Sequence, residues 1–487
     1  MMNNLLLIPL IVPLLSGIIL FIYPHYQRLL SIAALAVSGI ISLYLAYYSA
    51  VNGMLVINFG GWKAPYSIQF AGDALSLSLS SVSLLVTSLV LLYGYHRPLR
   101  EDVKFPFILF LLVGVNGSFL TADIFNLFVQ FEVTLLASFV LLAIGNRTAQ
   151  LKASIPYVVI NIVGSWLFLI AIGLTYRTYG TLSFAHLSER VASTGMTSYT
   201  IIIALLFLVV FSLKSALLLF MWLPKSYAVL STENSAIFSA LLTKVGVYAL
   251  LRVFTVIFSV HSSVTHVLIL DMSIITMIIG CIGVLAYRDI KYMICYQIIL
   301  SIGIIIFGLA TDSSAGLNGA ILYLLNDMII KALLFLTAGT IIHQLHTRLI
   351  RDNKGLIKAF PVLGVIFFLI TLTIGGVPPF GGFPGKLMII QAGLDSGEYT
   401  ATIIMIITSI ISLYTLLRMF IKVFLGEAAE LSTDRSFEPI HRHQYAAMIL
   451  LLTLSLCISL FANPLIELIQ SMDVETYTET MMTGGEN

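Results

Sequence analysis

Five ionisable side chains stand inside long apolar stretches of this 487-residue chain: Glu132, Lys214, Lys244, Lys331 and Lys386. An ionisable group at membrane depth is costly and marks a proton or ion pathway in many membrane proteins. Deprotonating a lysine at pH 7 costs roughly 4 to 5 kcal/mol, whereas keeping it charged in lipid costs between about 3 and more than 10 kcal/mol. A neighbouring carboxylate such as Glu132 can therefore decide whether the lysine keeps its proton, as a proton relay requires. The competing interpretation is a static ion pair that only positions two helices.

Polar residues at helical spacing extend this set. Lys244, Tyr248 and Arg252 repeat every four residues, so they share one face of a helix. Asp327 and Lys331 have the same spacing. These two patterns predict a polar path through the bundle.

Three more residues are auxiliary candidates for proton transfer: Lys225, His343 and His346. Histidine titrates near neutral pH and can exchange protons with bulk water, although a histidine at the end of a helix is more often an ordinary interfacial residue. The three cysteines lack the spacing of a metal or iron–sulfur site, so we predict no metal site.

The composition defines the class of protein that must position these groups. Hydrophobic residues make up 59% of the chain, charged residues 10%, and the mean hydropathy is +1.02. Soluble proteins average roughly 25% charged residues, so the chain is predicted to be an all-α integral membrane protein. The net charge of +2 gives no support to a nucleic-acid-binding function.

Apolar stretches near the length that spans a bilayer predict about fourteen transmembrane helices. They cover residues 5–22, 29–50, 75–95, 105–120, 124–144, 155–176, 200–223, 235–260, 267–287, 292–310, 317–343, 362–392, 401–425 and 445–461. Because the connections are short, residues 1–487 form a single membrane domain. The two longest connections suggest a surface hairpin, from 55–59 and 66–70, and an interfacial helix at 181–190.

Two of the predicted helices, the seventh and the twelfth, are interrupted beside a lysine. The seventh meets Pro224 shortly after Lys214, and the twelfth contains a run of glycines and prolines before Lys386. Backbone carbonyls at such breaks need another partner, such as a buried side chain or water. Glycine and proline can also simply kink a membrane helix.

The positions of the two breaks suggest an internal symmetry. They lie five helices apart and therefore have opposite orientation, which suggests two inverted repeats of five helices each. The repeats comprise helices four to eight, residues 105–260, and helices nine to thirteen, residues 267–425. Residues 1–95 and 445–487 form flanking helices.

Lysine and arginine collect in the odd-numbered connections, which the positive-inside rule assigns to the cytoplasm. Both termini are then predicted to lie outside. The cations in these connections are Arg28, Arg97, Arg100, Lys104, Arg147, Lys152, Lys225, Arg288, Lys291, Arg348, Arg351, Lys354, Lys358, Arg435 and Arg442. Lys63, Arg177 and Arg190 are the main exceptions in the even-numbered connections.

Four segments resemble the antiporter-like subunits shared by Mrp cation/proton antiporters and the membrane arm of respiratory complex I. They are TADIFNLFVQFE at 121–132, WLPK at 222–225, LTKVGVYALLR at 242–252 and KALLFLTAG at 331–339. The resemblance implies that Glu132 and Lys214 are the acid and lysine of a first half-channel. Lys244 would link it to the centre, Lys331 would be the central lysine of the second half, and Lys386 its terminal residue.

Within this family the chain looks most like the D subunit of an Mrp antiporter, since it ends soon after the fourteenth helix without a long lateral helix. It departs from members that have a histidine before the central lysine, because Asn326 and Asp327 stand there. The resemblance implies a proton-translocating subunit of a bacterial sodium/proton antiporter in the cell membrane. It also implies partner subunits, no bound redox cofactor and no enzymatic activity of its own.

Three alternatives remain open at this stage. The chain could be a proton-pumping subunit of a complex I-like NADH or ferredoxin:quinone oxidoreductase, and so part of an enzyme. It could be a carrier of an organic solute, with a wider pocket near the middle of the membrane. It could also be a scaffold whose buried charges only orient helices.

Overall fold

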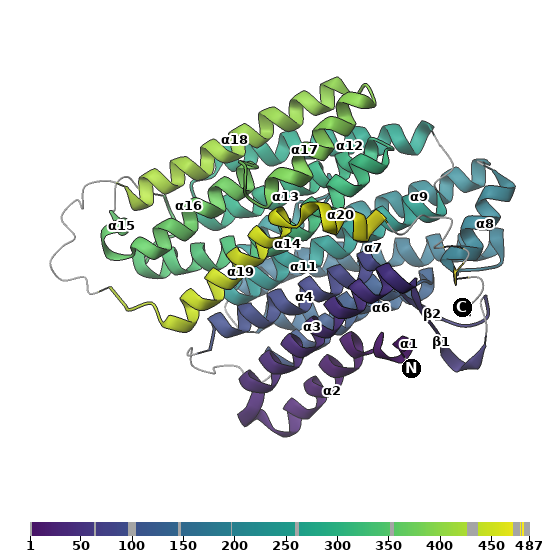
Figure 1. Cartoon of the computed structure of the whole chain (residues 1–487), viewed down its shortest axis with the longest axis horizontal. Helices are drawn as coiled ribbons and strands as arrows, with labels where there is room; N and C mark the ends of the chain where they lie inside the picture. Colours follow the sequence, from purple (N-terminus) through teal and green to yellow (C-terminus); the bar gives the residue numbers. More distant parts are fainter. Residues whose placement is uncertain are drawn as a thin grey trace.

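The computed structural model describes residues 2–62, 65–95, 104–144, 148–195, 197–258, 263–350, 355–425, 437–470, 478 and 480–481. Long helices run side by side along the longest axis of the molecule (Figure 1). The N-terminal elements are α1 (Met2–Leu5), α2 (Ile8–Ile22), η1 (Pro24–Tyr26), α3 (Gln27–Asn52), β1 (Leu55–Asn58), η2 (Phe59–Gly61), β2 (Gln69–Gly72), α4 (Ala74–Tyr93) and α5 (Lys104–Leu120). Next come α6 (Ile124–Ala143), α7 (Thr148–Tyr179), α8 (Phe184–Thr194), α9 (Ser198–Ser215), α10 (Trp222–Tyr227), α11 (Thr232–Arg252) and η3, a π-helical turn (Val253–Ile257).

The remaining helices are α12 (Ser263–Ala286), α13 (Ile290–Ala310), α14 (Ser314–Leu345), α15 (Leu356–Ala359), α16 (Pro361–Gly375), α17 (Gly382–Asp395), α18 (Tyr399–Phe424), α19 (Arg442–Leu460) and α20 (Ala462–Gln470). Within the described ranges, 11 helices are long and apolar enough to cross a membrane, and three shorter helices are also apolar. The predicted all-helical membrane fold is confirmed. The count of fourteen crossings and the two inverted repeats stay predictions.

α14 is the core of the bundle. Its most apolar stretch is buried completely, and α13 and α11 follow closely in burial. The outer helices, such as α7 and α19, expose much of their apolar surface instead. Charged groups on α14 and α11 are therefore shielded from the surface by other helices.

Both predicted breaks are present. α9 ends at Ser215 and α10 begins at Trp222, while α16 ends at Gly375 and α17 begins at Gly382. The chain leaves each first half through a left-handed residue, Ala216 with φ 64° and Gly376 with φ 78°. A left-handed residue is a common way to end a helix.

The predicted hairpin is confirmed, with a shift in its second strand. β1 pairs antiparallel with β2, and Leu55 lies opposite Gly72. The second strand was expected at 66–70 but runs to Gly72, since Asp73 then caps α4 by accepting a hydrogen bond from Ser76 N at 2.7 Å. α8 begins at Phe184, three residues later than the expected helix at 181–190, and its position relative to the membrane stays a prediction.

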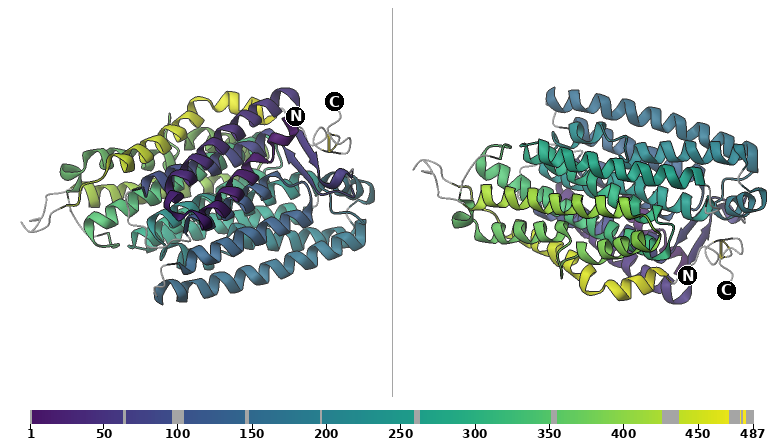
Figure 2. Two further views of the ribbon diagram at one scale, coloured as in Figure 1. Left: turned by 90° about the horizontal axis from the view of Figure 1, so that it is seen from below. Right: turned by 90° about the horizontal axis from the view of Figure 1, so that it is seen from above.

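Both ends of the described chain lie beside this hairpin. α1 packs against β1, and Gln69 Nε2 donates to Met481 O at 3.2 Å. Figures 1 and 2 show the hairpin and the N-terminus at one end of the bundle, with α15 at the opposite end. Lys63, Arg97, Arg100, Arg147, Arg351, Lys354 and Arg435, which entered the prediction of orientation, lie outside the described residues.

Candidate functional site

The centre of the site is a trio of charged side chains on α11 and α14. Lys244 Nζ lies 2.9 Å from Asp327 Oδ2, and Lys331 Nζ lies 3.3 Å from Asp327 Oδ1. Their side chains are 0%, 1% and 0% exposed for Lys244, Asp327 and Lys331. From the sequence, Asp327 and Lys331 were expected to share one face of a helix, and here both line the same site on α14. The contact across to α11, which makes Asp327 the shared carboxylate of two lysines, was not predicted.

One carboxylate can balance one ammonium group. The trio can therefore hold its charge-balanced pair on either side of Asp327, with the other lysine neutral. Lys244 Nζ also donates to Ser239 O at 2.8 Å, which anchors it on α11. The arrangement suits the transfer of a proton between two helices.

A second cluster joins α6, α7 and α9. Ser165 donates a hydrogen bond to Glu132 Oε1 and accepts one from Lys214 Nζ at 3.2 Å. Lys214 Nζ also donates to Asn161 O at 3.3 Å and lies 5.8 Å from the ring centre of Phe131. Across the part of the chain that is described, Glu132 and Lys214 make no direct ion pair, so Ser165 is the group that connects them.

Ser165 is a functional candidate that sequence reasoning missed. Its only signal was its spacing of four residues from Asn161 on one apolar helix, a pattern found on many buried helices. The predicted pairing of Glu132 with Lys214 is therefore realised through a hydroxyl.

The third group is Lys386 at the break between α16 and α17. Its Nζ donates to Ile374 O at 2.8 Å and to Ser409 Oγ at 3.1 Å. The expectation that a carbonyl at a break is satisfied by a buried side chain is confirmed for Ile374. Lys386 Nζ also lies 5.6 Å from the ring centre of Tyr323, which is one turn from Asp327 on α14.

Close backbone contact brings the first cluster to the central helix. A Cβ added to Gly246 would lie 2.5 Å from Ser215 N and 2.7 Å from Lys214 C. The end of α9 thus touches α11 only two residues from Lys244. α9 packs on α11, α11 on α14, and α14 on α17, so Lys214, the trio and Lys386 lie on a row of successively packed helices.

The auxiliary candidates lie apart from this row. Lys225 is exposed, and so are His343 and His346 at the end of α14. His343 Nε2 is 3.7 Å from Glu438 Oε2, and the two side chains are 51% and 69% exposed. Tyr248 is buried but donates to Phe119 O at 2.6 Å and accepts from Arg252 Nε at 3.0 Å.

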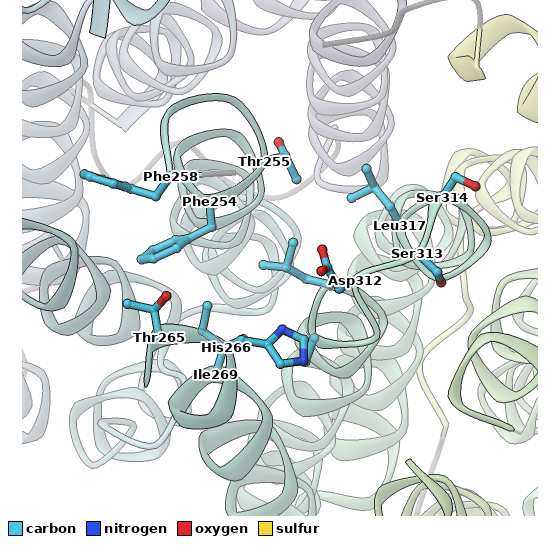
Figure 3. A pocket seen from close by; sticks show the side chains of 12 residues that line it. Phe254, Thr255, Phe258, Thr265, His266, Ile269, Asp312, Ser313, Ser314 and Leu317 are labelled. Carbon is cyan, nitrogen blue, oxygen red and sulfur yellow. The ribbon is translucent and has the colours of Figure 1, made fainter. Parts of the chain in front are cut away.

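A cavity of about 230 Å³, lined by both polar and apolar side chains, lies beyond the end of α11 and outside the row of lysines. Asp312 and His266 both line it (Figure 3). Over the residues that the structure describes, no group of three or more His, Cys, Asp or Glu side chains is arranged to hold a metal ion.

Residues 121–412 match the family described as NADH:quinone oxidoreductase/Mrp antiporter, TM. This range holds the four predicted lysines and the acid Glu132, as well as Ser165 and Asp327. The chain belongs to this family. The resemblance inferred from the four sequence segments is therefore confirmed, and the protein is a multi-pass membrane protein.

Within the NADH:quinone oxidoreductase/Mrp antiporter family, the chain is similar to the "Putative antiporter subunit mnhD2" of Staphylococcus saprophyticus. It is 49% identical over 88% of this chain and 86% of its own length. The protein of the same name from Staphylococcus aureus strain Mu3 is 45% identical over 94% of this chain and 93% of its own length.

Two solved structures share the fold. A chain of the Mrp complex from Dietzia sp. DQ12-45-1b is 26% identical, with a TM-score of 0.90 and coverage of 99% of both chains. A chain of the membrane-bound sulfane sulfur reductase, an archaeal respiratory membrane complex, has a TM-score of 0.88 and covers 98% of this chain and 100% of its own. At 24% identity, that second likeness concerns the fold alone.

Proposed function

We propose that the chain is a proton-translocating subunit of a multisubunit sodium/proton antiporter of the Mrp type. The observation that carries this proposal is the fully buried trio of Lys244, Asp327 and Lys331. Two lysines that share one carboxylate on adjoining helices can pass a proton from one side of the carboxylate to the other. Relatives named as antiporter subunits support the choice of transport over other uses of this fold.

The proposed route has three stages. Protons enter through Glu132, Ser165 and Lys214, and Lys244 passes them to the second half of the bundle. Lys331 and Lys386 complete the route, with Tyr323 between them on α14. The contact of α9 with Gly246 supports the first transfer, because it brings the backbone of Lys214 onto α11.

Sodium movement is proposed to depend on partner subunits in the complex. A hard cation is held by several oxygen ligands, whereas the proposed row consists mainly of lysines. The odd-numbered connections are proposed to face the cytoplasm of a bacterial cell, and both termini the outside.

The test is cation-dependent dissipation of a pH gradient in everted membrane vesicles that contain the whole complex. Glu132→Gln and Lys214→Met remove one charge each and are compared at matched assembly. Lys358→Gln is the control, because it removes an exposed lysine from the short helix α15. Loss of exchange in the first two variants, with the control active, supports the relay. Full exchange in both would refute it.

A proton-pumping subunit of a complex I-like oxidoreductase is the second candidate. The family description names NADH:quinone oxidoreductase beside Mrp antiporter, and this supports the second candidate function. Purification of the native complex distinguishes the two. Iron–sulfur absorbance and quinone reduction that co-purify with the chain would place it in an oxidoreductase, and their absence together with cation-dependent exchange supports the antiporter.

A further inference from the structure

A second buried ion pair lies at the C-terminal end of α11. Arg252 Nη2 contacts Asp73 Oδ2, and the two side chains are 11% and 1% exposed. Arg252 also donates from Nε to the hydroxyl of Tyr248 at 3.0 Å, and its guanidinium carbon lies 5.4 Å from the centre of that ring. The pair therefore joins α11 to the first residue before α4.

Asp73 uses its two oxygens for different purposes. Oδ1 accepts from Ser76 N at 2.7 Å and caps α4, while Oδ2 contacts Arg252. The cap needs an acceptor oxygen but no charge, because asparagine serves as well as aspartate at this position. The negative charge of Asp73 thus has a use beyond capping.

The Asp73–Arg252 pair lies on the same face of α11 as the central trio. Lys244, Tyr248 and Arg252 follow each other at four-residue intervals, about 6 Å apart along the axis. At one end of this stripe Lys244 contacts Asp327, and at the other end Arg252 contacts Asp73. Polar side chains thus extend from the trio to the end of α11.

Space for water adjoins this end. The π-helical turn η3 follows Arg252 directly, and its Phe254 and Thr255 line the cavity of about 230 Å³ in Figure 3. A cavity of this size with polar groups in its wall can hold several water molecules. Thr255, Asp312 and His266 provide such groups.

We propose that Asp73 is a proton-carrying residue at the end of a branch that leaves the central trio along α11, with Arg252 as its gate. This inference rests on the proposed function. A proton leaves Lys244 Nζ and passes through water to the hydroxyl oxygen of Tyr248. The hydroxyl gives up its own proton, which turns from Phe119 O toward Asp73 and forms an O–H bond with Oδ2. The guanidinium keeps its own protons and loses its counter-charge until Asp73 releases the proton to water and the pair forms again.

The alternative is a static clasp between α4 and α11, and paired neutral substitutions separate the two. Asp73→Asn keeps the cap and removes the charge, and Arg252→Gln removes the opposite charge. A clasp depends on charge balance, so the double variant should recover exchange to within about twofold of wild type. A proton carrier is lost in Asp73→Asn and in the double variant alike.

The experiment measures cation-dependent exchange by the assembled complex in everted vesicles. We expect exchange to fall at least about tenfold in Asp73→Asn and to stay low in the double variant. Recovery in the double variant, or wild-type exchange in Asp73→Asn, would overturn the proposal.

Tyr248→Phe provides an independent readout should the Asp73 variants fail to assemble. It removes the hydroxyl and keeps the ring, which packs 5.2 Å from the ring of Phe119. Reduced exchange at normal assembly supports the branch, and unchanged exchange overturns it. Glu132→Gln, measured in parallel, shows whether the proposed function or only the branch has failed. If Glu132→Gln abolishes exchange while Asp73→Asn and Tyr248→Phe retain it, only the branch is wrong.

Discussion

Ser165 is a small residue at a point where two charged groups would otherwise have no contact. Its hydroxyl donates to Glu132 and accepts from Lys214. A hydroxyl can donate and accept at the same time, so it can pass a proton between an acid and an amine without moving either helix.

Ser165→Ala should lower cation-dependent exchange by about tenfold while the complex assembles normally, because the hydroxyl link is lost without a change of charge. Exchange is measured in vesicles at matched protein levels. Ser154→Ala is the control, since Ser154 lies on the same helix and bonds Leu151 O at 2.8 Å. Equal exchange in the two variants would mean that Glu132 and Lys214 communicate by another route.

Asp327→Asn should impair assembly, since it leaves Lys244 and Lys331 buried without their carboxylate. Removing one partner of a buried ion pair costs about 3 to 5 kcal/mol. Adding both Lys244→Met and Lys331→Met should restore assembly but not exchange, because no buried ammonium group is then left without its carboxylate. The measurements are the yield of intact complex by size-exclusion chromatography and the vesicle assay. Restored exchange in the triple variant would show that the trio is only structural.

For single residues, the sequence predicted which side chains belong to the site better than it predicted which of them touch. Buried lysines stand out because lysine is rare in apolar stretches, and all four proved to be buried. Ser165 and the shared role of Asp327 depend on which helices adjoin, and helical spacing within one segment carries no information about that. The opposite error occurred for Lys225, His343 and His346. They lie in or near apolar stretches of the sequence, but the structure leaves them exposed.

At the scale of elements, the broken helices bring backbone close to the central helix. α9 ends where Ser215 meets Gly246 of α11, and a side chain at position 246 would collide with backbone atoms. The sequence predicted both breaks from proline and glycine. It could not predict that Gly246, inside an unbroken helix, is the place where one break packs.

Gly246→Ala should destabilise the protein by about 1 to 3 kcal/mol, as overpacking of a filled core does. Gly173→Ala is the matched control, because nothing lies within 4 Å of a Cβ at that position on α7. In the control, alanine should be neutral or stabilising, since it favours helix over glycine. Thermal unfolding of the purified complex compares them, and an equal midpoint in both variants would contradict the close packing at Gly246.

At the scale of the whole molecule, the described ends of the chain and the hairpin share one end of the bundle. The even number of crossings predicted from sequence requires the termini to share a side, and the structure agrees with this. The assignment of that side to the outside depends on cationic residues, several of which lie outside the described residues, and it stays a prediction.

Single cysteines introduced into a cysteine-free variant can test the orientation with a membrane-impermeant maleimide. Tyr66→Cys, at a site 85% exposed beside the hairpin, should react in intact cells. Leu349→Cys, at a site 46% exposed between α14 and α15, should react only after the membrane is permeabilised. The reverse pattern would invert the proposed topology.

The complete burial of α14 also bears on how the protein is made. Each central charge costs about 2.5 to 3.5 kcal/mol when a helix enters the membrane alone, and α14 carries both Asp327 and Lys331. Lys244, which contacts Asp327, belongs to α11 and is synthesised earlier. We therefore expect α14 to insert beside helices that are already in the bilayer. The ion pair of Asp327 with Lys244 would then lower the cost of inserting α14 and position it against α11 during biogenesis.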